Sequence, residues 1–513
     1  MVFVSKAPSM RVIRMFSFQT QAESDASRGI VRDLPRSSIP PGALYDSTDF
    51  ILDKPGVVYK RGGTSYQGTT VGATTTGVNF VSAPEFPTGG KVVALGADAH
   101  LYDITTASTD AGAFSITTVD RPKLYVDTLV VPASDGTTAP KKVTSPGGTI
   151  TIGNLGGTPP AGKYAEVHVS RVILGGSTAN PNRIYFSPIP NIESTWDTTN
   201  AYIDTTHKLS ALASIQGVLL AFSSGATERI IGNIPPGTVG ENMELQPLGQ
   251  VGCADARSIA AWGSYVVFAS QEGVYVTNGS GFDSLTEKPD GTGILSYWRS
   301  LYATVAANSG FIAGGILNRN YYILTLGYST TIVATLLCYL PRKAWMTLTN
   351  IGCIQYAPAS SGADELYGAT ISGHPGNKVL KFSGILSPAA GNKNDANGTA
   401  VTPTLQYRMS GEGIGLKRYG DGHLTYDMRD AATDNPTLAV SLDTGIEANS
   451  GFVAVDESPL AETTDSVRTR FTISKDAQAV NVKLAQTNAS AKTEIYVLEV
   501  QHLAFDLDSE VAA

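Results

Sequence analysis

Short apolar runs separated by polar turns recur along the middle of this chain at a nearly constant spacing. Each unit has two runs rich in Val, Ile, Leu, Tyr and Phe, one on either side of a turn. Arg171, Gly217 and Gly263 stand at corresponding places in three successive units, because 217 − 171 and 263 − 217 both equal 46. Strand-rich repeats of about 40 to 50 residues are typical of the blades of a β-propeller. The pattern therefore predicts an all-β protein built around a β-propeller.

Similar two-strand units lie on both sides of these three, and we assign residues 71–386 to the β-propeller. Because blade boundaries are poorly marked in a single sequence, the pattern accommodates six or seven blades. Residues 132–160 are rich in Gly, Thr and Pro and are expected to form surface loops. The paired runs are 92–95 with 101–104, 124–126 with 129–131, 171–175 with 183–186, 217–222 with 228–232, 264–269 with 273–276, 311–313 with 321–324, and 353–356 with 365–368.

The first 70 residues lack this periodicity and are predicted to form an extended N-terminal arm with an opening hairpin. Four prolines between residues 35 and 55 and few periodic apolar positions argue against a helix in residues 1–70. Near the end of this region, two short runs flank Lys54-Pro55-Gly56, and we expect this hairpin to open the propeller. The prolines are Pro35, Pro40, Pro41 and Pro55.

Beyond the repeat, the pattern changes to strict alternation of apolar and polar residues. Residues 387–401 are rich in Gly and Asn and are predicted to be a linker. Residues 402–513 are predicted to form a separate C-terminal antiparallel β-sandwich, because alternation indicates strands with one buried face. Its expected strands are 405–409, 423–428, 438–442, 468–473, 479–484 and 494–500.

Composition supports a folded β protein and disfavours the usual nucleic-acid binders. The 513 residues include 53 Gly and 27 Pro, and only 16% are charged, against about 25% in typical globular domains. The net charge of −8 is concentrated after residue 400, and no dense basic stripe is present. The start of the chain shows no secretory signal, which predicts synthesis in a cytoplasm. The most apolar run, 331–340, is too short to span a membrane as a helix and is predicted to be a buried strand.

The sequence gives only weak support for each candidate catalytic residue. Three acidic pairs lie in turn-like contexts, and a glycosidase needs two carboxylates in a shared cleft, so we interpret these acids as solvated loop residues. The stretch Ser108-Thr-Asp-Ala-Gly-Ala-Phe114 is similar to the Asp-box turn of sialidase-type propellers. However, its aromatic residue comes one position early and the motif is not repeated, so an ordinary turn is favoured. The acidic pairs are Asp364 with Glu365, Asp456 with Glu457, and Asp427 with Asp430.

Metal, phosphate and nucleophile motifs are not apparent, so we predict no catalytic, cofactor or metal site and no enzyme activity. Three widely spaced cysteines and six histidines show no ligand spacing, and no Gly-x-Ser-x-Gly motif is present. The glycine clusters 308–315 and 411–415 lack a phosphate-binding Lys. Trp262, Trp298 and Trp345, which we place at strand ends, are interpreted as packing anchors between blades rather than as a platform for stacking sugars. The cysteines are Cys253, Cys338 and Cys353, and the histidines are His100, His168, His207, His374, His423 and His502.

Several stretches resemble the β-propeller tail proteins of bacteriophages. Residues 39–52 (IPPGALYDSTDFIL) and 56–63 (GVVYKRGG) resemble the hairpin that precedes the blades in such proteins. Residues 212–222 and 251–275 are similar to their blades, in the order Gly-Cys, then Ser-Ile, then Phe-x-Ser-x-x-Gly-Val-Tyr. The similarity extends over about residues 30–505, and its motifs carry no catalytic residues.

The resemblance implies a structural virion protein: a tail nozzle or tail-stabilisation protein of a short-tailed phage. Such a subunit would form a homo-oligomeric ring, usually sixfold, below the head-to-tail adaptor, as part of the DNA exit channel, after assembly in the bacterial host cytoplasm. The implied partners are adaptor or portal-associated proteins, tail fibres or spikes, and genomic DNA in transient, non-specific contact. Because bound phosphates would oppose sliding, we expect acidic residues of 401–513 to face the channel.

Two other classes of function stay open on the sequence alone. A propeller that binds or depolymerises host-surface glycans would need an open cleft with aromatic residues. A cytoplasmic scaffold for protein partners would show a large apolar patch on a monomeric disc.

Overall fold

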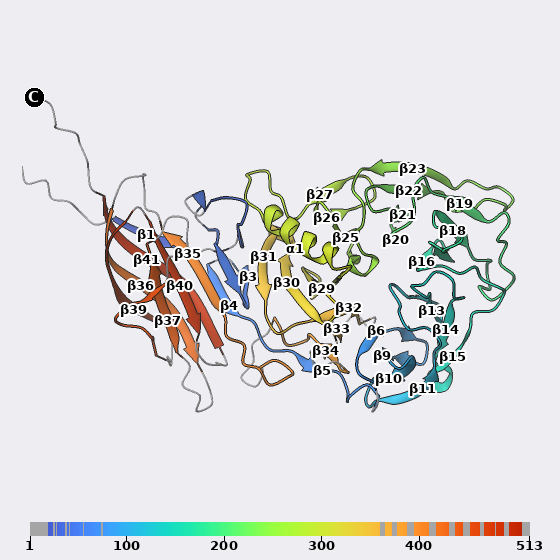
Figure 1. Cartoon of the computed structure of the whole chain (residues 1–513), viewed down its shortest axis with the longest axis horizontal. Helices are drawn as coiled ribbons and strands as arrows, with labels where there is room; N and C mark the ends of the chain where they lie inside the picture. The colour runs from blue at the N-terminus through green and yellow to red at the C-terminus, as the bar shows by residue number, and fades with distance from the viewer. Residues whose placement is uncertain are drawn as a thin grey trace, which may run out of the picture.

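The structure is a computed structural model and shows an all-β protein. In the part of the chain that it describes, one α-helix accompanies many small, mostly antiparallel sheets (Figure 1). The described residues are 19–23, 26, 28–35, 38–40, 42–54, 56–72, 75–359, 365–371, 377–386, 394–409, 417–429, 437–444, 452–461, 466–477, 479–486 and 492–504.

Among the described residues, seven groups of four antiparallel strands lie between residues 65 and 381. Group 1 contains β6 (Val78–Ser82), β9 (Val93–Gly96), β10 (His100–Asp103) and β11 (Thr109–Ala113). Group 2 contains β12 (Lys123–Tyr125), β13 (Thr128–Val131), β14 (Lys141–Thr144) and β15 (Thr151–Asn154). Group 3 contains β16 (Tyr164–His168), β17 (Arg171–Gly175), β18 (Arg183–Phe186) and β19 (Tyr202–Asp204). Group 4 contains β20 (Ala211–Ile215), β21 (Val218–Phe222), β22 (Thr227–Ile231) and β23 (Glu244–Gly249).

The last three groups repeat this plan, with one change in chain order. Group 5 contains β24 (Ala260–Trp262), β25 (Tyr265–Ser270), β26 (Gly273–Thr277) and β27 (Phe282–Ser284). Group 6 contains β28 (Phe311–Leu317), β29 (Tyr321–Tyr328), β30 (Thr331–Tyr339) and β31 (Ala344–Leu348). Group 7 contains β32 (Cys353–Pro358), β33 (Leu366–Thr370), β34 (Val379–Lys381) and, from the N-terminal region, β5 (Ser65–Tyr66). The smaller elements are β7 (Glu85–Phe86), β8 (Gly89–Gly90) and the 3-10 turns η2 (Pro146–Gly148), η3 (Ala256–Ser258) and η4 (Leu340–Arg342).

All seven strand pairs predicted from the sequence are antiparallel hairpins in these groups. Groups 2 to 5 share a two-residue turn between their first and second strands. At Gln216-Gly217 both residues have positive φ, of 45° and 78°, as a tight hairpin turn of type I′ requires. Residues 132–160 differ from the expected loop, because they contain β14 and β15.

The first strands of several neighbouring groups lie next to one another. β12 contacts β16, β16 contacts β20, β24 contacts β28, and β28 contacts β32. β32 in turn contacts β6, so group 7 lies beside group 1. Figure 1 shows the groups following one another around a circuit, from β6 at the lower right through β23 at the top to β34. Because β5 precedes β6 in the chain but pairs with β34, it ties the two ends of the circuit together.

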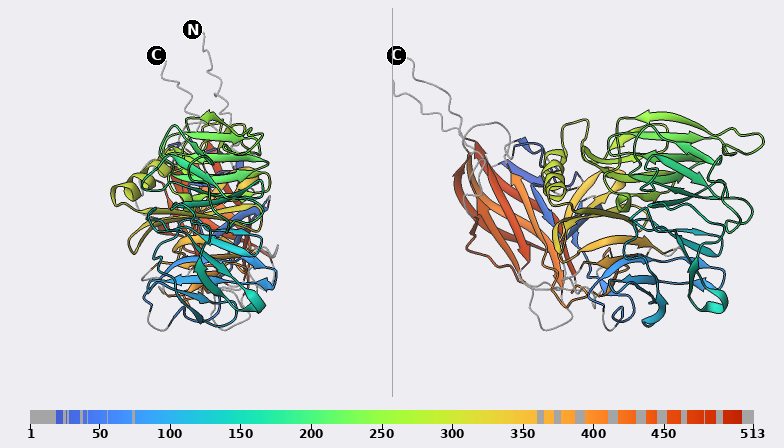
Figure 2. Two further views of the ribbon diagram at one scale, coloured as in Figure 1. Left: turned by 90° about the vertical axis from the view of Figure 1, so that its right-hand side faces the viewer. Right: turned by 45° about the vertical axis from the view of Figure 1, so that its right-hand side comes forward.

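The C-terminal region forms two further sheets on one side of this circuit (Figure 2). The first has the order β3-β4-β41-β36-β39, with β1 also paired to β41. The second continues group 6 through β31-β2-β35-β40-β37-β38. All six strands predicted for this region are present. The bounds are β1 (Gln19–Glu23), β2 (Asp46–Thr48), β3 (Phe50–Lys54), β4 (Val57–Lys60), β35 (Thr404–Met409), β36 (Lys417–Arg429), β37 (Leu438–Asp443), β38 (Val453–Ala454), β39 (Val467–Ala477), β40 (Val480–Gln486) and β41 (Lys492–Ala504).

The N-terminal hairpin differs from its expected position. Instead of opening group 1, β4 pairs with β41 through Val58 and Ile495, and β2 lies between β31 and β35. The C-terminal sheets are therefore not a separate sandwich, since one nine-stranded sheet runs from β28 to β38. The physical reason is the run Phe50-Ile51-Leu52, in which three consecutive side chains are buried and require apolar neighbours on both faces.

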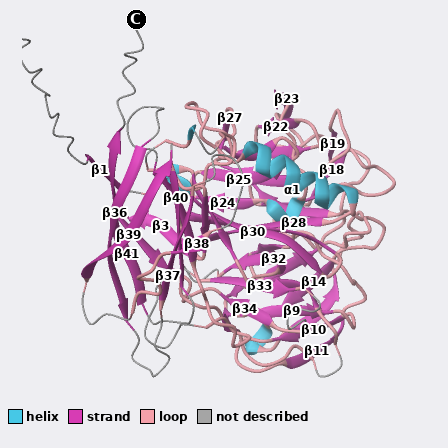
Figure 3. Cartoon of the chain, turned by 60° about the vertical axis from the view of Figure 1, so that its left-hand side comes forward, coloured by secondary structure: helices cyan, strands magenta, loops and turns pink. Residues whose placement is uncertain are grey.

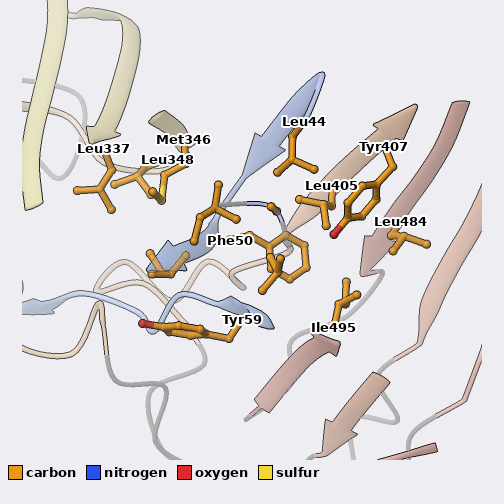
Figure 4. Close-up of a cluster of buried hydrophobic side chains, with 14 of the residues drawn as sticks. Leu44, Phe50, Tyr59, Leu337, Met346, Leu348, Leu405, Tyr407, Leu484 and Ile495 are labelled. Carbon is orange, nitrogen blue, oxygen red and sulfur yellow. The ribbon is translucent and has the colours of Figure 1, made fainter. Parts of the chain in front are cut away.

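A continuous hydrophobic core connects the two regions across this N-terminal segment (Figure 4). Leu44, Phe50 and Tyr59 lie between side chains of group 6 and side chains of the C-terminal sheets. The contacts on either side come from Leu337, Met346 and Leu348, and from Leu405, Tyr407, Leu484 and Ile495. We refer to this region, residues 43–64 with their buried neighbours, as the joint.

The helix was not predicted. α1 (Leu295–Ala307) packs near β29 and β30 (Figure 3), and Trp298 lies within it rather than at a strand end. Its buried residues, Trp298, Leu301 and Val305, follow the spacing of a helical face, a short signal among many strands. Asp33 accepts hydrogen bonds from the backbone N–H groups of Leu295 and Ser296, at 2.7 and 2.6 Å, and so satisfies the first turn of the helix.

Candidate functional site

A cavity of about 340 Å³ lies where the first strands of five of the groups converge. Its walls come from β6, from β12 and the residues before it, from η3 and β24, from β28 and from β32. On the β28 side the wall is closely packed, because a Cβ atom on Gly314 would clash with Tyr322 Oη and one on Gly315 would lie 2.8 Å from Tyr356 Cβ. The charged lining side chains are Asp120, Arg121, Lys123 and Arg257, and Gln355 lines the cavity with them.

Glu166 links two of the cations beside this cavity. It lies on β16 and is only 3% exposed. One carboxylate oxygen is 2.7 Å from Lys123 Nζ, and the other is 3.5 Å from Arg121 Nη2. Burial lowers the pKa of Lys123, and the charge of Glu166 offsets part of this effect. These ion pairs connect group 3 to the strand that begins group 2.

Arg257 and Asp255 form a second pair on the opposite wall. The guanidinium donates from Nε and Nη2 to the two carboxylate oxygens, at 3.0 and 2.7 Å. Asp255 also accepts from the Ile312 N–H at 3.0 Å, so it connects η3 to β28. Burial raises the pKa of Asp120, and the nearby charge of Arg257 opposes that rise.

Gln355 connects three of the groups at the cavity wall. Its amide nitrogen donates to the Asp120 carbonyl at 3.0 Å, and its amide oxygen accepts from the Val81 N–H at 3.4 Å. Groups 7, 2 and 1 are thus tied by one side chain. The polar side chains around this cavity cross-link neighbouring groups of strands, because each cation described above has a carboxylate close by.

A buried charge cluster holds the joint. Arg61 Nε donates to Asp49 at 2.6 Å, and its two terminal nitrogens donate to the carboxylate oxygens of Asp395, both at 2.8 Å. All three side chains are at most 1% exposed. Burial lowers the pKa of Arg61, but the hydrogen bonds and charges of Asp395 and Asp49 raise it above its ordinary value.

The cluster fastens three distant parts of the chain together. Asp49 accepts from the Thr349 N–H at 3.0 Å, next to β31, while Asp395 accepts from the Thr64 N–H at 3.2 Å. The predicted linker, residues 387–401, is therefore fixed at its described end, and its residues 387–393 lie outside the described part of the chain. Asp49 and Arg61 belong to the two N-terminal stretches that carry the resemblance.

The acidic residues considered as catalytic candidates in the sequence lie in different structural surroundings. Glu365 pairs with Lys381 at 2.8 Å, and Glu457 accepts from the Thr472 hydroxyl at 2.7 Å. Asp427 is not a solvated loop residue, because it lies in β36 and is 1% exposed. Asp364 and Asp430 lie outside the described residues.

The remaining candidates also have structural surroundings. Residues 109–113 form β11, an edge strand rather than a turn, in which Asp110 lies 2.9 Å from His100 Nδ1. The three cysteines are buried free thiols. Within the described ranges, no three His, Cys, Asp or Glu residues are grouped closely enough to hold a metal ion. The cluster 308–315 leads into β28, and 411–415 is outside the described residues.

The charged pairs around the cavity and the joint were not found from the sequence. Their one local signal is a charged residue within an apolar run, such as Glu166 in Tyr164-Ala-Glu-Val-His168. Such a residue indicates a buried charge in a chain with few charges, but the partner comes from a different group.

Neither the family models nor the curated proteins contain a match to this chain. Among the described residues, no helix has both the length and the apolar character needed to cross a membrane.

Proposed function

We propose that the seven groups form a seven-bladed β-propeller. The contact of β32 with β6 and the pairing of β5 with β34 support this proposal, because both join the last blade to the first. The four hairpins that begin at residues 171, 217, 264 and 311 support it as well, because their spacings are 46, 47 and 47 residues. An N-terminal arm and C-terminal β-sheets complete the chain.

We further propose that the protein is a structural subunit of a bacteriophage virion, a tail nozzle or hub ring that forms part of the DNA exit channel. The joint is the observation that carries this proposal. Residues 39–52 and 56–63, which resemble the opening of phage tail propellers, form the strands that connect the propeller to the C-terminal sheets. These two stretches therefore have a structural role, and we infer that the protein acts by assembly and not by catalysis.

The proposed partners follow from this role. Six copies would form a closed ring, with head-to-tail adaptor or portal-associated proteins on one side and tail fibres or spikes on the other. Genomic DNA would pass through with transient, non-specific contact. On the C-terminal sheets, Glu499 and Asp421 pair with Arg468 and Arg470, so the acidic surface proposed for the channel would come from other acids, such as Asp456.

Electron microscopy of the purified full chain tests this function. We expect closed rings, predominantly of six copies, with a lumen wide enough for duplex DNA. As a control for ring formation by aggregation, the particles should keep one copy number when the protein is diluted tenfold. Monodisperse monomers at all concentrations, with cleavage of host polysaccharide, would contradict the proposal.

A further inference from the structure

A second cavity, of about 470 Å³, opens at the surface between group 5 and the turn that follows β30. Its floor is apolar and buried, and consists of Val276, Leu285 and Leu340. Its position is separate from the central cavity and from the joint. Cavities of this volume hold small molecules in many proteins.

Aromatic side chains form one wall of this surface pocket. Trp262 and Tyr265 lie with their ring centroids 5.6 Å apart and their planes inclined by 37°, and Phe282 also contributes to the lining. Tyr265 is 42% exposed, which is high for a large aromatic residue. A pair of half-exposed rings beside a cavity leaves flat apolar surface that nothing in the described chain covers.

Trp262 also differs from the other three tryptophans of the chain. The indole N–H groups of Trp196, Trp298 and Trp345 each donate to a backbone carbonyl, at 2.9, 3.1 and 2.7 Å. The indole N–H of Trp262 has no such acceptor among the described residues. Trp298 and Trp345 are buried in one hydrophobic cluster, whereas Trp262 is only partly buried and keeps both a ring face and a donor for a ligand.

The rim of the pocket is polar and carries no net charge. Lys343 Nζ lies 2.7 Å from an Asp283 carboxylate oxygen, and this pair connects η4 to β27 across the pocket. Exposed Asn278 and Ser280 lie on the same rim. The rim therefore offers both donors and acceptors of hydrogen bonds without attracting ions of one sign.

We propose that this pocket binds a neutral pyranose sugar. A pyranose ring has an apolar face of C–H groups and an equatorial edge of hydroxyls. The C–H face suits the wall of Trp262 and Tyr265, and the hydroxyls suit the rim with its Asp283–Lys343 pair. This inference does not depend on the ring assembly, because every contact comes from one chain.

Saturation-transfer NMR with the purified full chain tests the site, with methyl glucoside, lactose, N,N′-diacetylchitobiose and glucuronic acid as probes. We expect saturable binding of at least one neutral sugar. Trp262→Ala and Tyr265→Ala should each weaken that binding about tenfold or more, because each removes a stacking surface. Tyr302→Ala, which truncates a half-buried aromatic residue on α1 outside the pocket, is the matched control and should leave binding unchanged.

Three results would overturn the proposal. They are the absence of saturable binding for all three neutral sugars, unchanged binding in a folded Tyr265→Ala variant, or tighter binding of glucuronic acid than of the neutral sugars. Because Tyr265 is exposed, its replacement should keep the thermal midpoint of the wild type, so a loss of binding in this variant reports on the site. Ring formation seen by electron microscopy is a separate result and would not change with these variants.

Discussion

Replacing Arg61 with alanine is expected to lower the free energy of unfolding by about 3–5 kcal/mol, the usual cost of removing one partner from a buried ion pair. The substitution leaves the carboxylates of Asp49 and Asp395 buried without their cation. It also removes the donor to the Thr349 carbonyl, at 2.9 Å, and so releases the contact with the loop after β31. Urea unfolding of the purified variant and of the wild type measures the difference.

Two further variants separate charge from geometry at the joint. Arg61→Lys keeps the charge but cannot donate to both carboxylates in the planar arrangement of Arg61, so we expect an intermediate loss of stability. Arg468→Ala removes an exposed arginine that pairs with Glu499, and should cost less than about 1 kcal/mol. If Arg61→Ala costs no more than Arg468→Ala, the buried cluster does not hold the joint.

The strands could be predicted from sequence because their signals are local. In group 4, for example, Val218–Phe222 and Thr227–Ile231 are apolar runs on either side of a short turn, and a tight turn at Gln216-Gly217 fixes where the second strand begins. Groups 2, 3 and 5 carry the same signal, a two-residue turn before the second strand. Helix α1 shows the limit of this approach, because a 13-residue helical face is easily taken for strand when strands surround it.

The pairing of strands across the chain could not be predicted in the same way. β2 has three residues, and its partners are Thr347 on β31 and the strand that begins at Thr404. β5 has two residues and pairs with β34, more than 300 positions further along the chain. Such short strands gain their stability from packing and not from intrinsic preference, so their partners are set by the assembled core.

For the candidate sites too, the sequence shows local signals but not the distant partners. A buried Glu166 or Arg61 can be suspected where a charge interrupts an apolar run, because an unpaired buried charge is too costly to keep. The identity of the partner depends on which groups meet, and the circuit brings Lys123 to Glu166 over 43 residues and Asp395 to Arg61 over 334. The surface pocket could not be predicted from the sequence either. The three tryptophans considered there differ only in burial and in the acceptor for the indole N–H, and both are properties of the folded chain.

Replacing Glu166 with glutamine is expected to lower the free energy of unfolding at pH 7 by about 2–3 kcal/mol. The loss is smaller than for Arg61→Ala because Lys123 keeps 27% of its side chain exposed and can reach water. The wild-type carboxylate raises the pKa of Lys123 against the effect of burial. In the Glu166→Gln variant, no carboxylate raises the pKa of Lys123, and both Lys123 and Arg121 lack their anionic partner.

The dependence of this loss on pH distinguishes the charge of Lys123 from a simple packing defect. A lysine with a lowered pKa binds fewer protons in the folded protein than in the unfolded chain, between its folded pKa and about 10.5. Stability therefore rises with pH in that window, and the cost of burying the charge is fully present below it. Because Glu166→Gln lowers the pKa of Lys123 further, the window opens at lower pH, and the difference from the wild type should shrink as pH rises from 7 to 10.

Urea unfolding at pH 7, 8, 9 and 10 measures this effect. The matched control is Glu272→Gln, which removes the same charge from an exposed pair with Arg299 on the surface, where both side chains are more than half exposed. It should cost less than about 1 kcal/mol at every pH. A loss for Glu166→Gln that stays constant from pH 7 to 10 would mean that Lys123 does not titrate there, and that the cavity wall is held by Arg121 and packing alone.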